Sequence, residues 1–216
     1  IAVLMDAGQM EWGNVEGMKK LLADVANGTD LGTTVGNGAA SVGKRFNHAR
    51  VPVVKGQAVP AWDPRPLKAT GVTYASSAMG ADHTAGLIVN PGLPPDQFAQ
   101  VSQEYQLVNA VCDSSGFCQF LQPNLDNIRA FFGFMVGEEV SREQIAEIGW
   151  QCLANEWEFN ARAGLTEADD DLPACLREEG VGPGGVMKFD VSTDIIKQAK
   201  VRSPWRDQLF ATKAAG

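Results

Sequence analysis

The chain has 216 residues, 44% of them hydrophobic, and its 18 Lys and Arg against 26 Asp and Glu give a net charge of −8. This length fits one large domain or two small ones, with enough apolar surface to bury a core. The acidic balance argues against nucleic acid and membranes as partners, because phosphate-rich surfaces bind clustered Lys and Arg. The longest strongly apolar run, Phe131 to Val136, is far shorter than the ~20 residues of a membrane helix.

The first predicted helix covers residues 14–26, where Asn14 can cap the start and apolar side chains recur at helical spacing. Residues 32–43 are rich in small side chains and predict a loop that enters a short helix at about 39–46. Several prolines between Val51 and Pro66 predict an extended connector, because proline removes an amide donor and blocks helix interiors.

That connector is the predicted domain boundary. It would separate residues 1–50, the end of a preceding helical domain, from residues 51–216, a C-terminal helical domain. Just after it, residues 71–86 are dense in Gly, Ala, Ser and Thr. Small side chains of this kind allow another helix or a ligand to approach the backbone closely.

The second half of the chain is also predicted to be helical. Because no alternating pattern is long enough for a sheet, the expected fold class is all-α and multi-helical. The expected elements are a turn at 91–95, a helix from its cap Asp96 to about Cys112, a loop at 113–116, a buried helix at 124–136, a helix at 141–163 opened by a capping box, an irregular acidic segment at 166–185 and a short helix capped by Ser192 or Thr193. The residues expected to face the core are Phe98, Val101, Tyr105, Val108, Val111, Ile145, Ile148, Leu153, Trp157 and Phe159.

The chain has 4 cysteines, and none of them forms a C-x-x-C pair. In a chain of this length, such a number does not indicate a disulfide scaffold. We expect Cys152 and Cys175 to be reduced, buried thiols of a cytoplasmic protein, whereas the sequence assigns no role to Cys112.

Residues 38–45 follow the G-x-x-x-x-G-K pattern of a phosphate-binding loop. Arg45, however, stands where that loop needs Ser or Thr to hold magnesium, and residues 29–34 do not resemble the buried strand that precedes it. An ordinary helix entry is therefore the preferred interpretation.

Residues 113–118 combine a carboxylate, a glycine turn and a thiol. Such a turn can place Asp113, the backbone amides of Gly116 and Phe117, and the Cys118 thiol around one small site. A carboxylate accepts hydrogen bonds from amino-substituted heterocycles, and a thiolate ligates iron. One cysteine cannot hold a 4Fe–4S cluster, so these residues alone favour the competing interpretation, an Asx turn followed by a buried cysteine.

Histidine is rare in this chain, which has 2 of them, His48 and His83. His83 lies within the small-residue segment, where another group can come close and a histidine can move a proton near neutral pH. The competing interpretation is a structural histidine, and we adopt it for His48.

Several segments, taken in order, resemble the aldehyde:ferredoxin oxidoreductase family. Its K-G-x-E-x-P-x-x-D-P-R segment is similar to residues 55–65, with Ala58 at the acidic position. Its G-x-x-Y-A-T-S-x-x-G-x-x-H segment is similar to residues 71–83.

The resemblance continues through the second half. The family's D-x-x-G-L-C is similar to residues 113–118, with Phe117 in place of Leu, and its F-N-x-R-x-G-x-T-x-x-D-D-x-L-P is similar to residues 159–173. The resemblance runs from about Met10 to Pro173, and ordered matches of this kind are more specific than any single one.

The resemblance implies tungsten or molybdenum held by a bis-pterin cofactor, beside a 4Fe–4S cluster. It implies that Asp113 contacts a pterin, within the turn that includes Gly116 and Phe117. Cys118 would ligate the cluster, and His83 would lie near the metal and transfer protons. The role of Asp82 stays open.

Other family features are missing from this sequence. The remaining cluster cysteines belong to an upstream C-x-x-C-x-x-x-C motif, and the chain lacks that motif, the D-x-x-G-L-D motif and the N-terminal β-rich domain. We therefore expect the C-terminal part of such an enzyme, inactive alone. The expected partners are ferredoxin and the preceding region of the same protein, with a homodimer as a further option, and neither nucleic acid nor a membrane.

The implied reaction oxidises an aldehyde to a carboxylic acid and passes electrons through the cluster to ferredoxin. Two alternatives stay open: a subunit of a related tungsten enzyme that reduces aromatic thioesters, and a non-catalytic helical interaction module. Residues 195–216 depart from the family's usual ending, which indicates a divergent subfamily with its own substrate.

Overall fold

The computed structural model describes residues 1–121 and 125–202. This part of the chain is a set of helices with a two-stranded antiparallel sheet, so the predicted all-α fold class is confirmed. The α-helices are α1 (Ala2–Asp6), α2 (Val15–Ala26), α3 (Asp30–Gly36), α4 (Gly38–Arg45), α5 (Lys68–Ser76), α6 (Phe98–Ser115), α7 (Leu125–Val136), α8 (Arg142–Arg162), α9 (Ala174–Glu178) and α10 (Thr193–Gln198). The strands are β1 (Val53–Val54) and β2 (Gln57–Ala58), and the 3-10 turns are η1 (His83–Ala85), η2 (Pro95–Gln97), η3 (Gln119–Leu121), η4 (Glu167–Asp169) and η5 (Pro183–Gly185).

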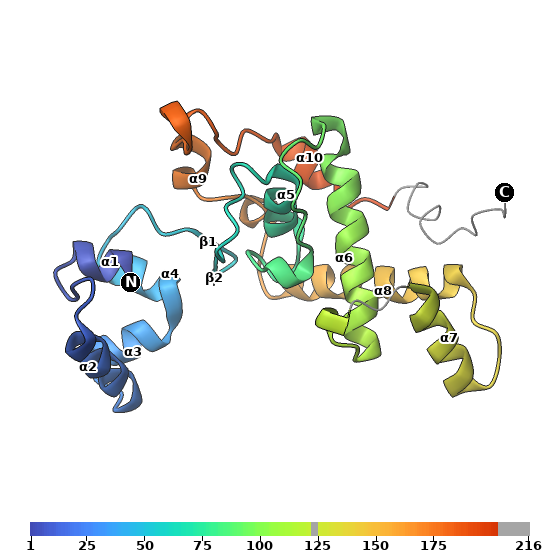
Figure 1. The fold of residues 1–216 in the computed structure, drawn as a ribbon, viewed down its shortest axis with the longest axis horizontal. Coiled ribbons are helices and arrows are strands. Elements are labelled where there is room, and N and C mark those ends of the chain that lie inside the picture. The colour runs from blue at the N-terminus through green and yellow to red at the C-terminus, as the bar shows by residue number, and fades with distance from the viewer. Residues whose placement is uncertain (122–124, 203–216) are drawn as a thin grey trace.

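Helices α1 to α4 gather around the N-terminus, and the other helices lie beyond the extended connector that follows them (Figure 1). The predicted helix at 14–26 is confirmed as α2. Its start follows from Asn14, whose side chain accepts a 2.8 Å hydrogen bond from the Gly17 amide and satisfies a donor that the helix leaves free. The core of this group is formed by Val3, Leu4, Leu21 and Val42.

The loop predicted from residue 32 is wrong, because residues 30–36 form α3. Thr29 caps this helix by accepting a 3.1 Å hydrogen bond from the Gly32 amide. A Cβ atom on Gly32 would lie 1.9 Å from the carbonyl oxygen of Asp24. The small residues therefore serve the close packing of α3 on α2.

Residues 38–45 form α4, as the helix-entry interpretation predicts. The element before them is α3 and not the strand that a phosphate-binding loop requires. The Arg45 guanidinium donates to Asp30 at 2.6 Å and to Thr34 at 2.9 Å, so it holds α4 against α3.

The segment from Val51 to Pro66 holds no helix, which confirms the extended connector. It contains the β1–β2 hairpin, in which Val53 pairs with Ala58. The division of the chain into residues 1–50 and 51–216 stays a prediction.

Helix α5 was predicted as a small-residue segment and not as a helix. All of its residues from Ala69 to Ser76 are buried. Close approach, which the small side chains did predict, is confirmed: a Cβ atom on Gly71 would lie 2.3 Å from the ring of Phe189. The buried Thr73 hydroxyl lies 2.8 Å from the Ser102 hydroxyl of α6, so hydrogen bonds as well as apolar contacts join the two helices.

Helix α6 begins later and ends later than predicted. Asp96 lies in η2 and is not the cap, because Gln97 occupies that position. The loop predicted at 113–116 is also wrong, since the helix continues through Ser115 and ends at Gly116 in the left-handed conformation, with φ 76°.

Tyr105, expected in the core, is 42% exposed. The buried face instead includes the polar residues Ser102, Gln103 and Gln106.

Helix α8 crosses α6, and α7 lies beside its N-terminal end (Figure 1). The predicted capping box is confirmed, because Ser141 and Gln144 each bond the backbone amide of the other. Ile145 and Leu153 are buried as predicted, whereas Ile148 and Phe159 are exposed, so their assignment to the core is wrong.

Helix α7 is confirmed as a helix, but its predicted burial is wrong for most of its apolar side chains. Ile128 is fully buried, whereas Phe134, Met135 and Val136 are exposed. The structure therefore leaves an uncovered apolar surface on this helix.

The segment at 166–185 is irregular as predicted, except for the short helix α9. Ser192 caps α10 by accepting a hydrogen bond from the Ile195 amide, as expected. Residues 203–216, most of the predicted divergent ending, lie outside the described residues.

Candidate functional site

His83 lies in the short turn η1, which Asp82 organises. The Asp82 carboxylate accepts hydrogen bonds of 2.8 Å from both the amide and the hydroxyl of Thr84. The same carboxylate oxygen lies 3.7 Å from Nδ1 of His83, whose side chain is 43% exposed. The turn therefore holds a histidine at the surface beside a fixed negative charge.

Asp113 occupies the last turn of α6, directly before the left-handed Gly116. The Gly116 amide donates to the Asp113 carbonyl at 3.1 Å and closes the helix end. Asp113 is exposed. The structure thus presents the carboxylate on a helix end and not on a flexible loop.

Phe117 and Cys118 follow the helix end and have opposite environments. Phe117 packs against the core between α6 and α8, and its ring centroid lies 5.1 Å from that of Phe131 on α7. Cys118 is exposed and directly precedes η3. The competing interpretation of a buried cysteine is therefore wrong for Cys118.

Gln119 joins the His83 turn to the end of α6. Its side-chain amide donates to the Thr84 carbonyl at 3.0 Å and contacts a carboxylate oxygen of Asp113 at 3.4 Å. Asn109, also on α6, donates to the same Thr84 carbonyl at 2.9 Å. Two segments that the sequence singled out separately are therefore adjacent in space. Asn109 and Gln119 could not be singled out from the sequence, since neither belongs to a motif and both act through a tertiary contact.

A small cavity of about 40 Å³ lies beside Asp113, between α6 and α8. Gln106, Cys152 and Glu156 are among its lining residues. The Cys152 thiol lies 3.7 Å from the Glu156 carboxylate.

Burial raises the pKa of Glu156 above its ordinary value. The nearby Asp113 carboxylate adds to this rise in pKa, and the hydrogen bond with the Cys152 thiol opposes it. Burial and, after it, the Glu156 charge likewise raise the pKa of the Cys152 thiol. Because its pKa is raised, the Cys152 thiol is not an activated thiolate.

The described side chains around the His83 turn and the end of α6 do not form a complete set of metal ligands. Among residues 1–121 and 125–202, no group of three or more His, Cys, Asp and Glu side chains is placed to hold a metal ion. Cys118 offers one exposed thiol, and Asp113 offers one exposed carboxylate. They do not make a self-contained iron–sulfur site, which needs a full set of thiolates.

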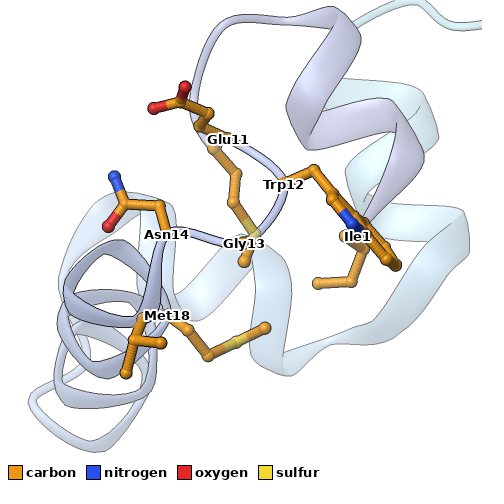
Figure 2. Close-up of a pocket in the computed structure, with 8 residues that line it drawn as sticks. Ile1, Glu11, Trp12, Gly13, Asn14 and Met18 are labelled. Atoms are coloured by element: carbon orange, nitrogen blue, oxygen red, sulfur yellow. The ribbon is translucent and has the colours of Figure 1, made fainter.

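A different, apolar hollow of about 480 Å³ lies at the start of α2. Figure 2 shows the Trp12 ring beside Ile1, with Met18 across the hollow and the polar ends of Glu11 and Asn14 pointing away from it. No candidate site residue lines it, and the Glu11 carboxylate among its lining residues points away from it.

Nowhere in the described part of the chain does a helix have both the length and the apolar character needed to cross a membrane.

Comparison with known proteins gives one consistent result. A family model described as "Aldehyde ferredoxin oxidoreductase, domains 2 & 3" matches residues 3–199. The tungsten-containing aldehyde ferredoxin oxidoreductase of Thermococcus kodakarensis is 29% identical over 196 residues, which cover 84% of this chain and 32% of that protein. The protein of the same name from Pyrococcus furiosus is 28% identical over 196 residues, with the same coverage of 84% and 32%. The chain therefore spans about a third of the length of these curated relatives.

Proposed function

Because the chain belongs to the aldehyde ferredoxin oxidoreductase family, we propose that it forms one side of a tungsten–pterin and iron–sulfur site. The parent enzyme oxidises aldehydes to carboxylic acids and passes the electrons to ferredoxin. The remaining side of the site comes from the part of the protein that the relatives have in addition to the matched third of their length. This chain alone does not catalyse the reaction.

The observation that carries the proposal is the contact between the His83 turn and the end of α6. Gln119 contacts both the His83 turn and Asp113, and Cys118 is its neighbour in sequence. Gln119 and Thr84 are 35 positions apart, so that the fold and not the chain order brings the two segments together.

Cys118 supplies an iron ligand in this proposal. Its exposed thiol belongs to no group of three or more potential metal ligands in the described part of the chain, so the proposal takes the other thiolates from elsewhere in the protein. The bound cluster would supply one-electron transfer, and the metal–pterin group would supply the two-electron chemistry.

Asp113 orients the cofactor. Its exposed carboxylate is fixed at a helix end by the closure at Gly116, and Gln119 restrains it from the side. A carboxylate accepts hydrogen bonds from the amino-substituted edge of a pterin. Rigid support of such a group is what an orienting residue requires.

His83 moves protons. Its imidazole is 43% exposed, and its Nδ1 atom lies 3.7 Å from an oxygen of the Asp82 carboxylate. Aldehyde oxidation to an acid releases protons, and a histidine can carry them because it changes charge near neutral pH.

Exposed apolar side chains on η3, directly after Cys118 in sequence, and on α7 support a partner region. They are Phe120, Leu121, Phe134, Met135 and Val136. Large apolar side chains left exposed to water are typical of a surface that another protein segment covers. We assign this surface to the remaining part of the same protein, which also brings the other cluster thiolates. A second copy of the chain is the alternative occupant.

The test uses the full-length protein that contains this chain, purified without oxygen and loaded with tungsten. Turnover of a panel of aliphatic and aromatic aldehydes with ferredoxin as acceptor is the expected result. Reduction of aromatic thioesters without aldehyde oxidation would favour the related thioester-reducing enzyme. Absence of both tungsten and iron would favour a helical interaction module.

A further inference from the structure

We propose that Gln119 and Asn109 form a clamp that positions the His83 turn against the end of α6; this inference rests on the proposed function for its catalytic consequence. Both side chains donate to one atom, the Thr84 carbonyl oxygen, at 3.0 Å and 2.9 Å. A carbonyl oxygen has two lone pairs, so the two donors use its full capacity. The clamp therefore fixes η1 from two directions.

The clamp acts on the backbone next to the proton-transfer residue. Thr84 follows His83 directly, and its own amide and hydroxyl are held by Asp82. Every hydrogen-bonding group of Thr84 is thus restrained, by Asp82 on one side and by α6 and η3 on the other. Within residues 1–121 and 125–202, the His83 imidazole makes no hydrogen bond to another side chain or to the backbone, and its Nδ1 lies 3.7 Å from Asp82, so the direction of the ring depends on the turn that carries it.

Close packing strengthens the restraint. Gly86, the residue after η1, lies against α6, where a Cβ atom would come within 3.1 Å of the Tyr105 Cβ and 3.4 Å of the Gln106 amide nitrogen. The turn is therefore held at both ends, by Asp82 and by Gly86, and the clamp fixes its middle.

Gln119 also contacts Asp113, so it links the cofactor-orienting carboxylate to the His83 turn. Its amide stands between the Thr84 carbonyl and the Asp113 carboxylate, and both of these are acceptors. Only a donor can satisfy them together. A leucine would leave the Thr84 carbonyl with Asn109 as its remaining donor and would remove the Gln119 contact from the Asp113 carboxylate, and a glutamate would place a third acceptor between them. A lysine can donate to both.

The experiment compares Gln119→Leu, Gln119→Glu and Gln119→Lys in the full-length, cofactor-loaded protein. Hydrogen exchange of residues 82–86, followed by mass spectrometry, reports the turn without any need for activity. We expect faster exchange in Gln119→Leu and Gln119→Glu and near-normal exchange in Gln119→Lys. Loss of kcat by up to about 10²-fold with little change in KM is expected for the two non-donating variants, since the reacting groups are misplaced and not lost.

Two further variants sharpen the result. Asn109→Leu combined with Gln119→Leu removes both donors and should increase exchange more than either single change. Gln9→Leu is the matched control, because Gln9 is an exposed glutamine that also donates to a backbone carbonyl, that of Ala7, outside the site. It should leave exchange of residues 82–86 and turnover unchanged.

The outcomes separate the two proposals. If the wild-type protein does not oxidise aldehydes but the exchange pattern appears, the proposed function fails and the clamp stands. Unchanged exchange of residues 82–86 in the double variant, or a Gln119→Lys variant no better than Gln119→Leu, would overturn the clamp.

Discussion

The ammonium group of Lys55 lies 2.7 Å from the Asp170 carboxylate, and the two side chains are 5% and 10% exposed. Lys55 also donates to the carbonyl of Ala75 at the end of α5. The other oxygen of Asp170 accepts from Lys200 at 2.5 Å. One buried carboxylate thus ties the β1–β2 hairpin to the segment after η4 and to the end of α10, around the helix that precedes the His83 turn.

Replacing Lys55 with Met should destabilise the protein by about 1.5–3 kcal/mol, because it removes one of the two ammonium groups that pair with the buried Asp170 carboxylate and leaves Lys200 as the other. Chemical denaturation measures the change. Lys19→Met is the matched control, since the Lys19–Glu16 pair is exposed, with side-chain exposures of 66% and 81%, and its loss should cost below about 1 kcal/mol. Equal losses in the two variants would contradict the role given to the buried pair.

Gly32→Ala should destabilise the α2–α3 pair, because its Cβ would lie 1.9 Å from the Asp24 carbonyl oxygen and the backbones would have to separate. The expected cost is at least about 1–3 kcal/mol, as for other overpacked sites. Gly36→Ala in the same helix is the control, since its Cβ would meet its nearest neighbour at 3.5 Å. That variant should be neutral or more stable by up to about 1 kcal/mol, because Ala favours helix. Thermal unfolding of both variants checks the prediction.

Glu156→Gln should be more stable than wild type, and this difference in the free energy of unfolding should increase with pH. The folded-state pKa of Glu156 is raised, chiefly by burial, so the folded protein holds this proton more tightly than the unfolded chain does. Its contribution to stability is therefore fully present below the ordinary glutamate value near pH 4.5 and is lost as the pH rises through the folded-state pKa. Glutamine never ionises and avoids this loss.

The measurement is the unfolding free energy of wild type and Glu156→Gln across pH 4 to 8 (roughly the range in which glutamates titrate). The difference should grow with pH and stay below about 1 kcal/mol, because water screens a partly exposed carboxylate. Glu158→Gln on the same helix is the control. A difference that shrinks with rising pH would contradict the assignment.

His83→Gln should lower the turnover of the full-length enzyme by about 10²–10⁴-fold, the usual contribution of a positioned proton-transfer group. Metal and iron contents should not change, since no metal is assigned to His83. His48→Gln is the control, because His48 contacts Asp6 at 3.1 Å among α1 to α4 and has no assigned role in the reaction. Comparable loss in both variants would argue against a special role for His83.

Local signals in the sequence predicted the helices that depend on local chemistry. Asn14 and Ser141 start helices through bonds to residues only three positions away, so their patterns could be recognised without the fold. Helix α5 could not be, because its burial depends on contacts such as that of Gly71 with Phe189, which is distant in sequence.

The candidate site, too, could be predicted only in part from the sequence. Asp113, Cys118 and His83 stand in motifs that resemble the family's and could be singled out one by one. The adjacency of the His83 turn to the segment that ends α6 could not be predicted. It rests on the tertiary hydrogen bonds of Gln119 and Asn109 to Thr84. The exposure of α7 also escaped prediction, because an apolar helix that faces a further part of the protein has the same pattern as one that faces its own core.

The most direct measurement is electron paramagnetic resonance of the reduced full-length protein, with its iron content, in Cys118→Ala beside Cys175→Ala. Cys175 packs partly buried against the core around α5 and has no assigned ligand role. The account predicts that Cys118→Ala loses or alters the 4Fe–4S signal and iron, while Cys175→Ala keeps both. An unchanged cluster signal and full iron content in Cys118→Ala would contradict a site shared between this chain and the rest of the protein.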